Sequence, residues 1–87
     1  MASTSHLLVT ASQLGAMLQA ARKVRGLTQS DLATRIGLSQ SRVSYLELNA
    51  QDLSVEQLLA WCAVLGLELS VATRGSTVGS APPTTDW

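Results

Sequence analysis

The amino-acid sequence predicts an all-α fold of four to five short helices, followed by one strand and a polar tail. Three observations support this prediction. Apolar residues recur every three or four positions over most of the chain, glycines stand where these stretches end, and the core must be aliphatic because the 87 residues include no Phe. A chain of this length buries only ~60% of the surface that its unfolded form exposes, so a second copy would add stability.

The first two helices are expected over roughly 11–25 and 28–37. Thr10 and Gln13 have the spacing of a capping box, and the apolar residues that follow at helical intervals end before Gly26. Thr28 and Asp31 stand at the start of the second helix, and Gly37 tolerates the positive φ that often ends one. The expected inward residues are Leu14, Met17, Leu18, Ala21 and Val24 in the first helix, and Leu32, Ala33 and Ile36 in the second.

Two further helices are expected after Ser39 and after Ser54, each of which can cap a helix. The third helix turns Val43 and Leu46 inward, and its opposite side is polar. Ser54 and Gln57 repeat the capping box, and Gly66 ends the fourth helix. The apolar stripe of the fourth helix consists of Val55, Leu58, Leu59, Cys62 and Leu65, and Trp61 is expected to be a partly buried packing or dimer residue.

After Gly66 the apolar period changes from helical to two. Leu67, Leu69 and Val71 alternate with other residues, as in a strand with one buried face. Because a lone strand leaves its backbone groups unpaired, we expect it to pair with the same strand of a second chain across a twofold axis. The expected organisation is an N-terminal arm at 1–9, a helical domain at 10–66, a dimerising strand at 67–73 and a disordered tail at 74–87 that ends in Trp87.

The composition argues against an enzyme, a metalloprotein and a membrane protein. One His and one Cys cannot supply a tetrahedral zinc site, and no catalytic constellation or phosphate-binding loop is evident. We therefore expect no catalytic residues, no metal, no cofactor and no small-molecule ligand. No apolar run approaches the ~20 residues that cross a bilayer, which favours a cytoplasmic protein with no membrane partner.

The charge is balanced over the whole chain but not along it. The six basic and six acidic residues give a formal net charge of zero, yet five basic and two acidic residues precede Ala50, while one basic and four acidic residues follow from there. This split indicates a basic part suited to nucleic acid and an acidic part with another use.

The most informative segment is 29–46, whose pattern is that of a helix-turn-helix. Ala33 is small where two helices nearly touch, Gly37 stands in the sharp turn, and Val43 locks the second helix across the first. The alternative is an ordinary helical hairpin in a structural bundle. Such a hairpin does not require all three of these residues at these positions. The outward face of the third helix also lacks acidic residues, which favours DNA binding.

Residues 26–33 (GLTQSDLA) and 36–44 (IGLSQSRVS) resemble the lambda-repressor-like, Xre-type helix-turn-helix family, and the similarity extends over about 14–65. It implies that Gln29 grips a phosphate and braces the start of the recognition helix. It also implies a largely buried salt bridge between Arg22 and Glu47. The implied base-reading positions are Ser39, Gln40, Ser41 and Tyr45, and Ser30, Arg42 and Ser44 are implied phosphate or base contacts. Tyr45 is larger than the residue usual at its position.

Residues 65–71 (LGLELSV), with the short polar tail and Trp87, are similar to the HipB-type antitoxins. This similarity implies C-terminal strands paired across a homodimer, an inverted-repeat operator of double-stranded DNA, and a HipA-like Ser/Thr kinase toxin as partner. It further implies that the protein neutralises the toxin and represses its own operon, with Trp87 as a candidate toxin contact. A stand-alone Xre-family regulator without a toxin is the alternative.

Overall fold

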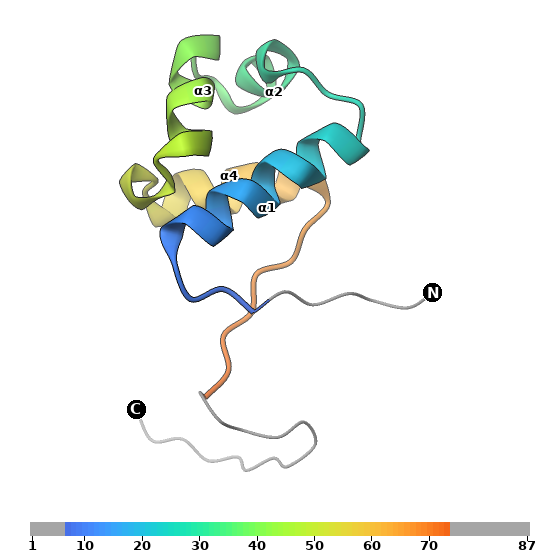
Figure 1. The fold of residues 1–87 in the computed structure, drawn as a ribbon. Helices are drawn as coiled ribbons and strands as arrows, with labels where there is room; N and C mark the ends of the chain where they lie inside the picture. The colour runs from blue at the N-terminus through green and yellow to red at the C-terminus, as the bar shows by residue number, and fades with distance from the viewer. Residues whose placement is uncertain (1–6, 74–87) are drawn as a thin grey trace.

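The computed structural model describes residues 7–73, and in this part of the chain the predicted all-α fold is confirmed. Figure 1 shows α2 and α3 side by side above α1 and α4, with the segment after α4 leading away from the helices. The elements are α1 (Ala11–Val24), α2 (Gln29–Ile36), α3 (Gln40–Leu48), a 3₁₀ turn η1 (Ala50–Asp52) and α4 (Val55–Leu65).

The helices begin at the polar residues that the sequence indicated. Thr10, Thr28 and Ser54 each accept a hydrogen bond from a backbone N–H in the first turn, and the residue three positions later bonds back to the cap. In α2 this partner is Asp31, whose Oδ2 accepts the Thr28 N–H at 3.0 Å, and these bonds hold the pKa of Asp31 below its usual range. Gly37 and Gly66 end α2 and α4 at φ of 75° and 71°.

The core is aliphatic around a single tryptophan. The largest side chains that are fully buried belong to Trp61, Leu18, Leu32, Leu46 and Val43. Trp61 was expected to be partly buried, but its exposed fraction is 0%, because residues of the other helices enclose it within one chain. Its indole Nε1 has no hydrogen-bond partner among the described residues. Cys62 is also buried, and this burial raises the pKa of its thiol.

Three residues of the predicted inward stripes lie outside this core. Val24, Val55 and Leu59 are 87%, 70% and 50% exposed. In α1 and α4 the apolar stripe is wider than the strip that the neighbouring helices cover. The residues at the edge of the stripe therefore remain exposed. Helical spacing therefore predicted which side of α1 and α4 faces inward, but not how wide the covered strip is.

Residues 67–73 have no regular secondary structure in this single chain. Leu67 is half-buried against the core, whereas Leu69 and Val71 are 45% and 95% exposed. Pairing across a dimer needs a second chain, so the dimerising strand stays a prediction. No helix within residues 7–73 has the length and apolar character that a membrane span requires. The predicted tail at 74–87, with Trp87, and most of the predicted arm lie outside the described residues.

Candidate nucleic-acid interface

The turn between α2 and α3 holds the two helices across each other. The Leu38 N–H donates to the Ala33 carbonyl at 3.0 Å, and Ala33 is only 3% exposed where α2 meets the core. Ser39 then caps α3 by accepting the Arg42 N–H on its Oγ at 3.1 Å. Because Val43 and Leu46 are fully buried, α3 is fixed in rotation about its axis and presents its other side outward.

The outward side of α3 carries most of the predicted DNA-contacting residues. Ser39, Gln40, Ser41, Arg42 and Tyr45 are exposed, and Ser44 is half-buried. Ser30 is exposed in the first turn of α2, and Gln29 beside it is half-buried. The structure therefore gathers the eight predicted positions on α3, its cap and the start of α2.

Arg22 and Glu47 form an ion pair between α1 and α3. Arg22 Nε lies 2.6 Å from Glu47 Oε2, and Arg22 Nη2 donates to Glu47 Oε1 at 3.2 Å. The two side chains are 8% and 2% exposed, and Arg22 Nη1 also donates to the Leu27 carbonyl at 2.9 Å. This two-bond geometry has the charge pairing and hydrogen bonds that a buried carboxylate requires.

A chain of hydrogen bonds runs from this ion pair to the outward face. Gln29 Nε2 donates to Glu47 Oε1 at 3.0 Å, and Gln40 Nε2 donates to Gln29 Oε1 at 2.7 Å. The first residue of α2 thus connects the buried carboxylate to the first residue of α3. The family resemblance implied that Gln29 braces the recognition helix, whereas its bond to Glu47 was not foreseen.

An open depression lies where these residues meet. It is lined by Arg22, Leu27, Thr28, Gln29, Ser30 and Gln40. It contains the start of α2, and the positive end of a helix dipole favours an anion. The polar side chains of Thr28, Gln29, Ser30 and Gln40 in this lining can hydrogen-bond to a DNA phosphate.

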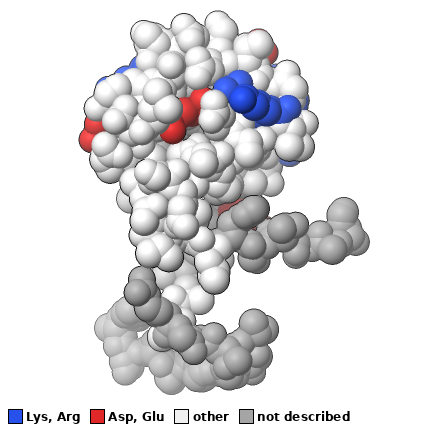
Figure 2. Space-filling view, in the orientation of Figure 1, with Lys and Arg blue, Asp and Glu red and all other residues white. Residues whose placement is uncertain are grey.

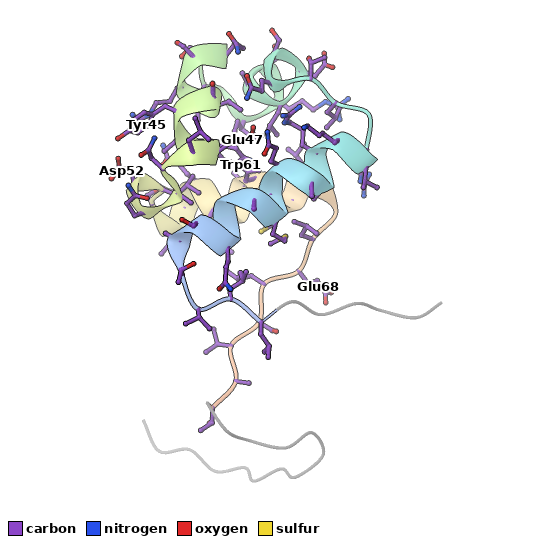
Figure 3. All side chains as sticks on the ribbon, viewed as in Figure 1. Tyr45, Glu47, Asp52, Trp61 and Glu68 are labelled. Atoms are coloured by element: carbon purple, nitrogen blue, oxygen red, sulfur yellow. The ribbon has the colours of Figure 1, made fainter. Side chains whose placement is uncertain are left out.

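Tyr45 has two partners near the end of α3. Its hydroxyl donates to Asp52 Oδ2 in η1, and the Arg42 guanidinium carbon lies 5.2 Å from its ring centroid. The bond to Asp52 and the charge of that carboxylate raise the pKa of Tyr45, so the phenol stays protonated. Figure 3 shows Tyr45 and Asp52 on the same side of α3, away from Glu47 and Trp61 in the interior. Asp52 could not be predicted as a partner of Tyr45 from the sequence, because their spacing of seven residues crosses a helix end.

Figure 2 shows one large group of basic side chains on this face of the molecule. The largest group lies over the region where α1 ends in Figure 1, smaller basic groups appear at the edges of the view, and the acidic side chains form separate groups. Lys23 in the last turn of α1 and Arg25 at its C-terminal cap are exposed. A local excess of basic groups supplies the attraction to phosphate that the net charge of the chain does not.

Comparison with known proteins agrees with this geometry. The family model described as Helix-turn-helix matches residues 18–71. Among solved structures, a HipB-O1-O2 complex is 25% identical with a TM-score of 0.71, and it covers 79% of this chain and 100% of its own. A HipA-HipB-O2-O3 complex is 24% identical with a TM-score of 0.73, covering 80% and 99%. No protein of curated function matches significantly. The chain belongs to the helix-turn-helix family, as an Xre-like DNA-binding regulator.

Proposed function

We propose that the protein represses transcription as a homodimer on an inverted-repeat operator and acts as the antitoxin of a HipA-like Ser/Thr kinase. The observation that carries the DNA-binding part is the outward face of α3. This face is polar, has no acidic residue and begins with Gln40, whose amide Gln29 holds in place. The buried Val43 and Leu46 hold α3 in one orientation about its axis, so that its polar face is free to enter the major groove.

The side chains of this face divide into two groups by the contacts they suit. Gln40 offers a donor and an acceptor, which match the edge of adenine, and the short Ser39 and Ser41 allow the helix to approach the bases closely. Arg42 and Gln29 suit phosphates, and Ser30 and Ser44 can meet either phosphates or bases. Tyr45 can meet a base only as an acceptor while its hydroxyl donates its proton in the hydrogen bond to Asp52.

Binding to a specific and to a random duplex, measured against salt concentration, separates the two groups. Gln40→Ala should cost about 1 to 3 kcal/mol of discrimination per half-site, because it removes a bidentate contact. Arg42→Ala should weaken binding to both duplexes and reduce the salt slope by about one. Equal losses on both duplexes for Gln40→Ala would remove Gln40 from the base-reading residues.

Three observations support the antitoxin role. The fold resembles HipB over the full length of that protein, one of the matched structures is a complex with HipA, and the alternating residues 67–71 suit a strand across a dimer. The second candidate is a stand-alone Xre-family repressor, which the family match supports equally. An adjacent gene for a HipA-like kinase would favour the antitoxin, and its absence would favour the stand-alone repressor.

Trp87 gives a direct test of the toxin contact. A large aromatic residue at the end of a segment rich in Gly, Ser, Thr and Pro is suited to anchor an interface. Deletion of Trp87 should weaken binding to the kinase in titration calorimetry and leave operator affinity unchanged. Unchanged affinity and enthalpy for the kinase would remove Trp87 from the interface.

A further inference from the structure

The direction of one side-chain amide, that of Gln29, depends on a buried charge. An amide presents a donor at one end and an acceptor at the other, and rotation by half a turn exchanges them. Gln29 lies between Glu47 Oε1 and Gln40 Nε2, with contacts of 3.0 Å and 2.7 Å. Whatever fixes the direction of Gln29 therefore also fixes what it offers to Gln40.

Glu47 permits only one direction. Its side chain is 2% exposed and its two oxygens accept hydrogen bonds from Arg22, and a carboxylate in such an ion pair can only accept. The end of the Gln29 amide that faces Glu47 must be the NH₂ group. If the amide were reversed, its carbonyl oxygen would lie against the negative carboxylate oxygen of Glu47, where little water can separate them. The carbonyl of Gln29 consequently faces α3 and accepts the Gln40 Nε2 proton.

This arrangement leaves Gln40 with a defined set of groups for a base. One of its two Nε2 protons is used by Gln29, so one N–H and the carbonyl oxygen remain. Adenine offers an acceptor at N7 and a donor at N6, which match this set. Guanine offers two acceptors, and the Gln40 carbonyl would then face an oxygen.

We propose that Glu47 is a positioning residue for base recognition, which sets the donor and acceptor direction of Gln40 through Gln29 and so favours adenine over guanine. The inference rests on the proposed function, because it requires Gln40 to contact a base. Glu47 thus has a second role beside its salt bridge with Arg22, because its carboxylate also accepts a hydrogen bond from Gln29.

The test uses the full chain and the duplex that it enriches from a pool of random sequence. The affinity for this duplex is divided by the affinity for the same duplex with adenine replaced by guanine at the Gln40 contact. The unchanged protein should show a ratio of about 5 to 150. Glu47→Gln keeps the size of the side chain but can offer its own NH₂ to Gln29, so both amides can reverse, and most of the ratio should be lost.

Two controls separate positioning from stability. Leu65→Val weakens the core in α4, where Leu65 is 3% exposed, and should lower the melting temperature without changing the ratio. Gln29→Met leaves Arg22 and Glu47 paired but interrupts the chain, so it should lower the ratio as Glu47→Gln does. The double variant should lose no more than either single variant. All ratios are measured well below each melting temperature.

The outcomes distinguish the inference from the proposed function. If Gln40→Ala leaves the ratio unchanged, Gln40 does not read this base, and both the positioning role of Glu47 and the base-reading role proposed for Gln40 are wrong. If Gln40→Ala abolishes the ratio while folded Glu47→Gln retains it, only the positioning role is overturned. Additive losses in the double variant would also overturn it, because Glu47 would then act by a route other than Gln29.

Discussion

At the scale of single residues, Glu47 connects the stability of the fold to its outward face. Its carboxylate pairs with Arg22 and accepts the Gln29 amide. The family resemblance predicted the pairing with Arg22, and the structure places the two side chains in contact. The resemblance could not predict the bond between Glu47 and Gln29. No spacing in the sequence relates the start of α2 to the last turn of α3. That contact depends on how α2 and α3 cross.

Removal of Glu47 should destabilise the domain strongly. Glu47→Ala leaves the Arg22 guanidinium buried without its counter-charge, which typically costs about 3 to 5 kcal/mol. Chemical denaturation of the variant gives the free energy of unfolding. Glu56→Ala is the control, since Glu56 is exposed in the first turn of α4 and its loss should cost under about 1 kcal/mol. A similar small loss for both variants would show that the buried pair contributes little.

Asp31 should make stability depend on pH in the acid range. Its pKa is lowered in the folded protein by the hydrogen bonds with Thr28, so folding favours the ionised form. This stabilisation is complete above the ordinary range of aspartate pKa values and disappears as the pH falls through the folded pKa. Asp31→Asn should therefore be less stable at neutral pH and lose less on acidification. Identical pH profiles in denaturant unfolding would contradict this account.

At the scale of elements, α1 and α3 approach each other closely at Gly15. Gly15 is buried, and a Cβ there would overlap the carbonyl oxygen of Glu47 in α3. The role of Gly15 could not be predicted from the sequence, because a glycine within a helical pattern does not show by itself whether another backbone lies against it. The need for a glycine at this position becomes clear only from the packing of α1 against α3.

Gly15→Ala should therefore destabilise the protein, although alanine is the better helix former. Propensity alone would gain about 1 kcal/mol, whereas forcing backbone atoms apart in a packed interior typically costs about 1 to 3 kcal/mol. Thermal melts give the sign. Ala20→Gly, at an exposed position of α1, should cost about 1 kcal/mol and calibrates the propensity. A melting temperature raised by Gly15→Ala would show that α1 can move away from α3 at little cost.

Helix starts and ends were the most predictable features. Their signals are local: a polar cap, its partner three residues on, and a glycine that accepts positive φ. The 3₁₀ turn η1 was not predicted, because it is too short to show a period. The bond between Tyr45 and Asp52 depends on this turn, and it was missed for the same reason.

At the scale of the whole molecule, one chain builds a complete small core but leaves apolar residues outside it. Leu69 and Val71, at the end of the described part, are exposed although they alternate as a strand would. Trp61 belongs to the core of a single chain and does not provide a dimer surface. The segment 67–71 therefore remains the one that we expect to join two copies as a strand.

Truncation after Gly66 tests this expectation. The shortened protein should sediment as a monomer, because its strand can no longer pair, while the full chain sediments as a dimer. Circular dichroism should show that the helices remain, since Leu67 is the one residue of 67–73 that packs on the core. A truncated protein that stays a dimer would place the contact elsewhere, for which the exposed Val55 and Leu59 of α4 are available.

The most direct test of the central claim, that a dimer reads DNA through α3, is repeated selection from duplexes of random sequence. We expect enrichment of an inverted repeat whose half-sites lie about 10 base pairs apart or a multiple of this, because two recognition helices must enter successive major grooves. Gln40→Ala should relax the sequence at one symmetric pair of positions and leave the spacing unchanged. Retention of duplexes with no enriched sequence, or enrichment of a site without twofold symmetry, would contradict the account.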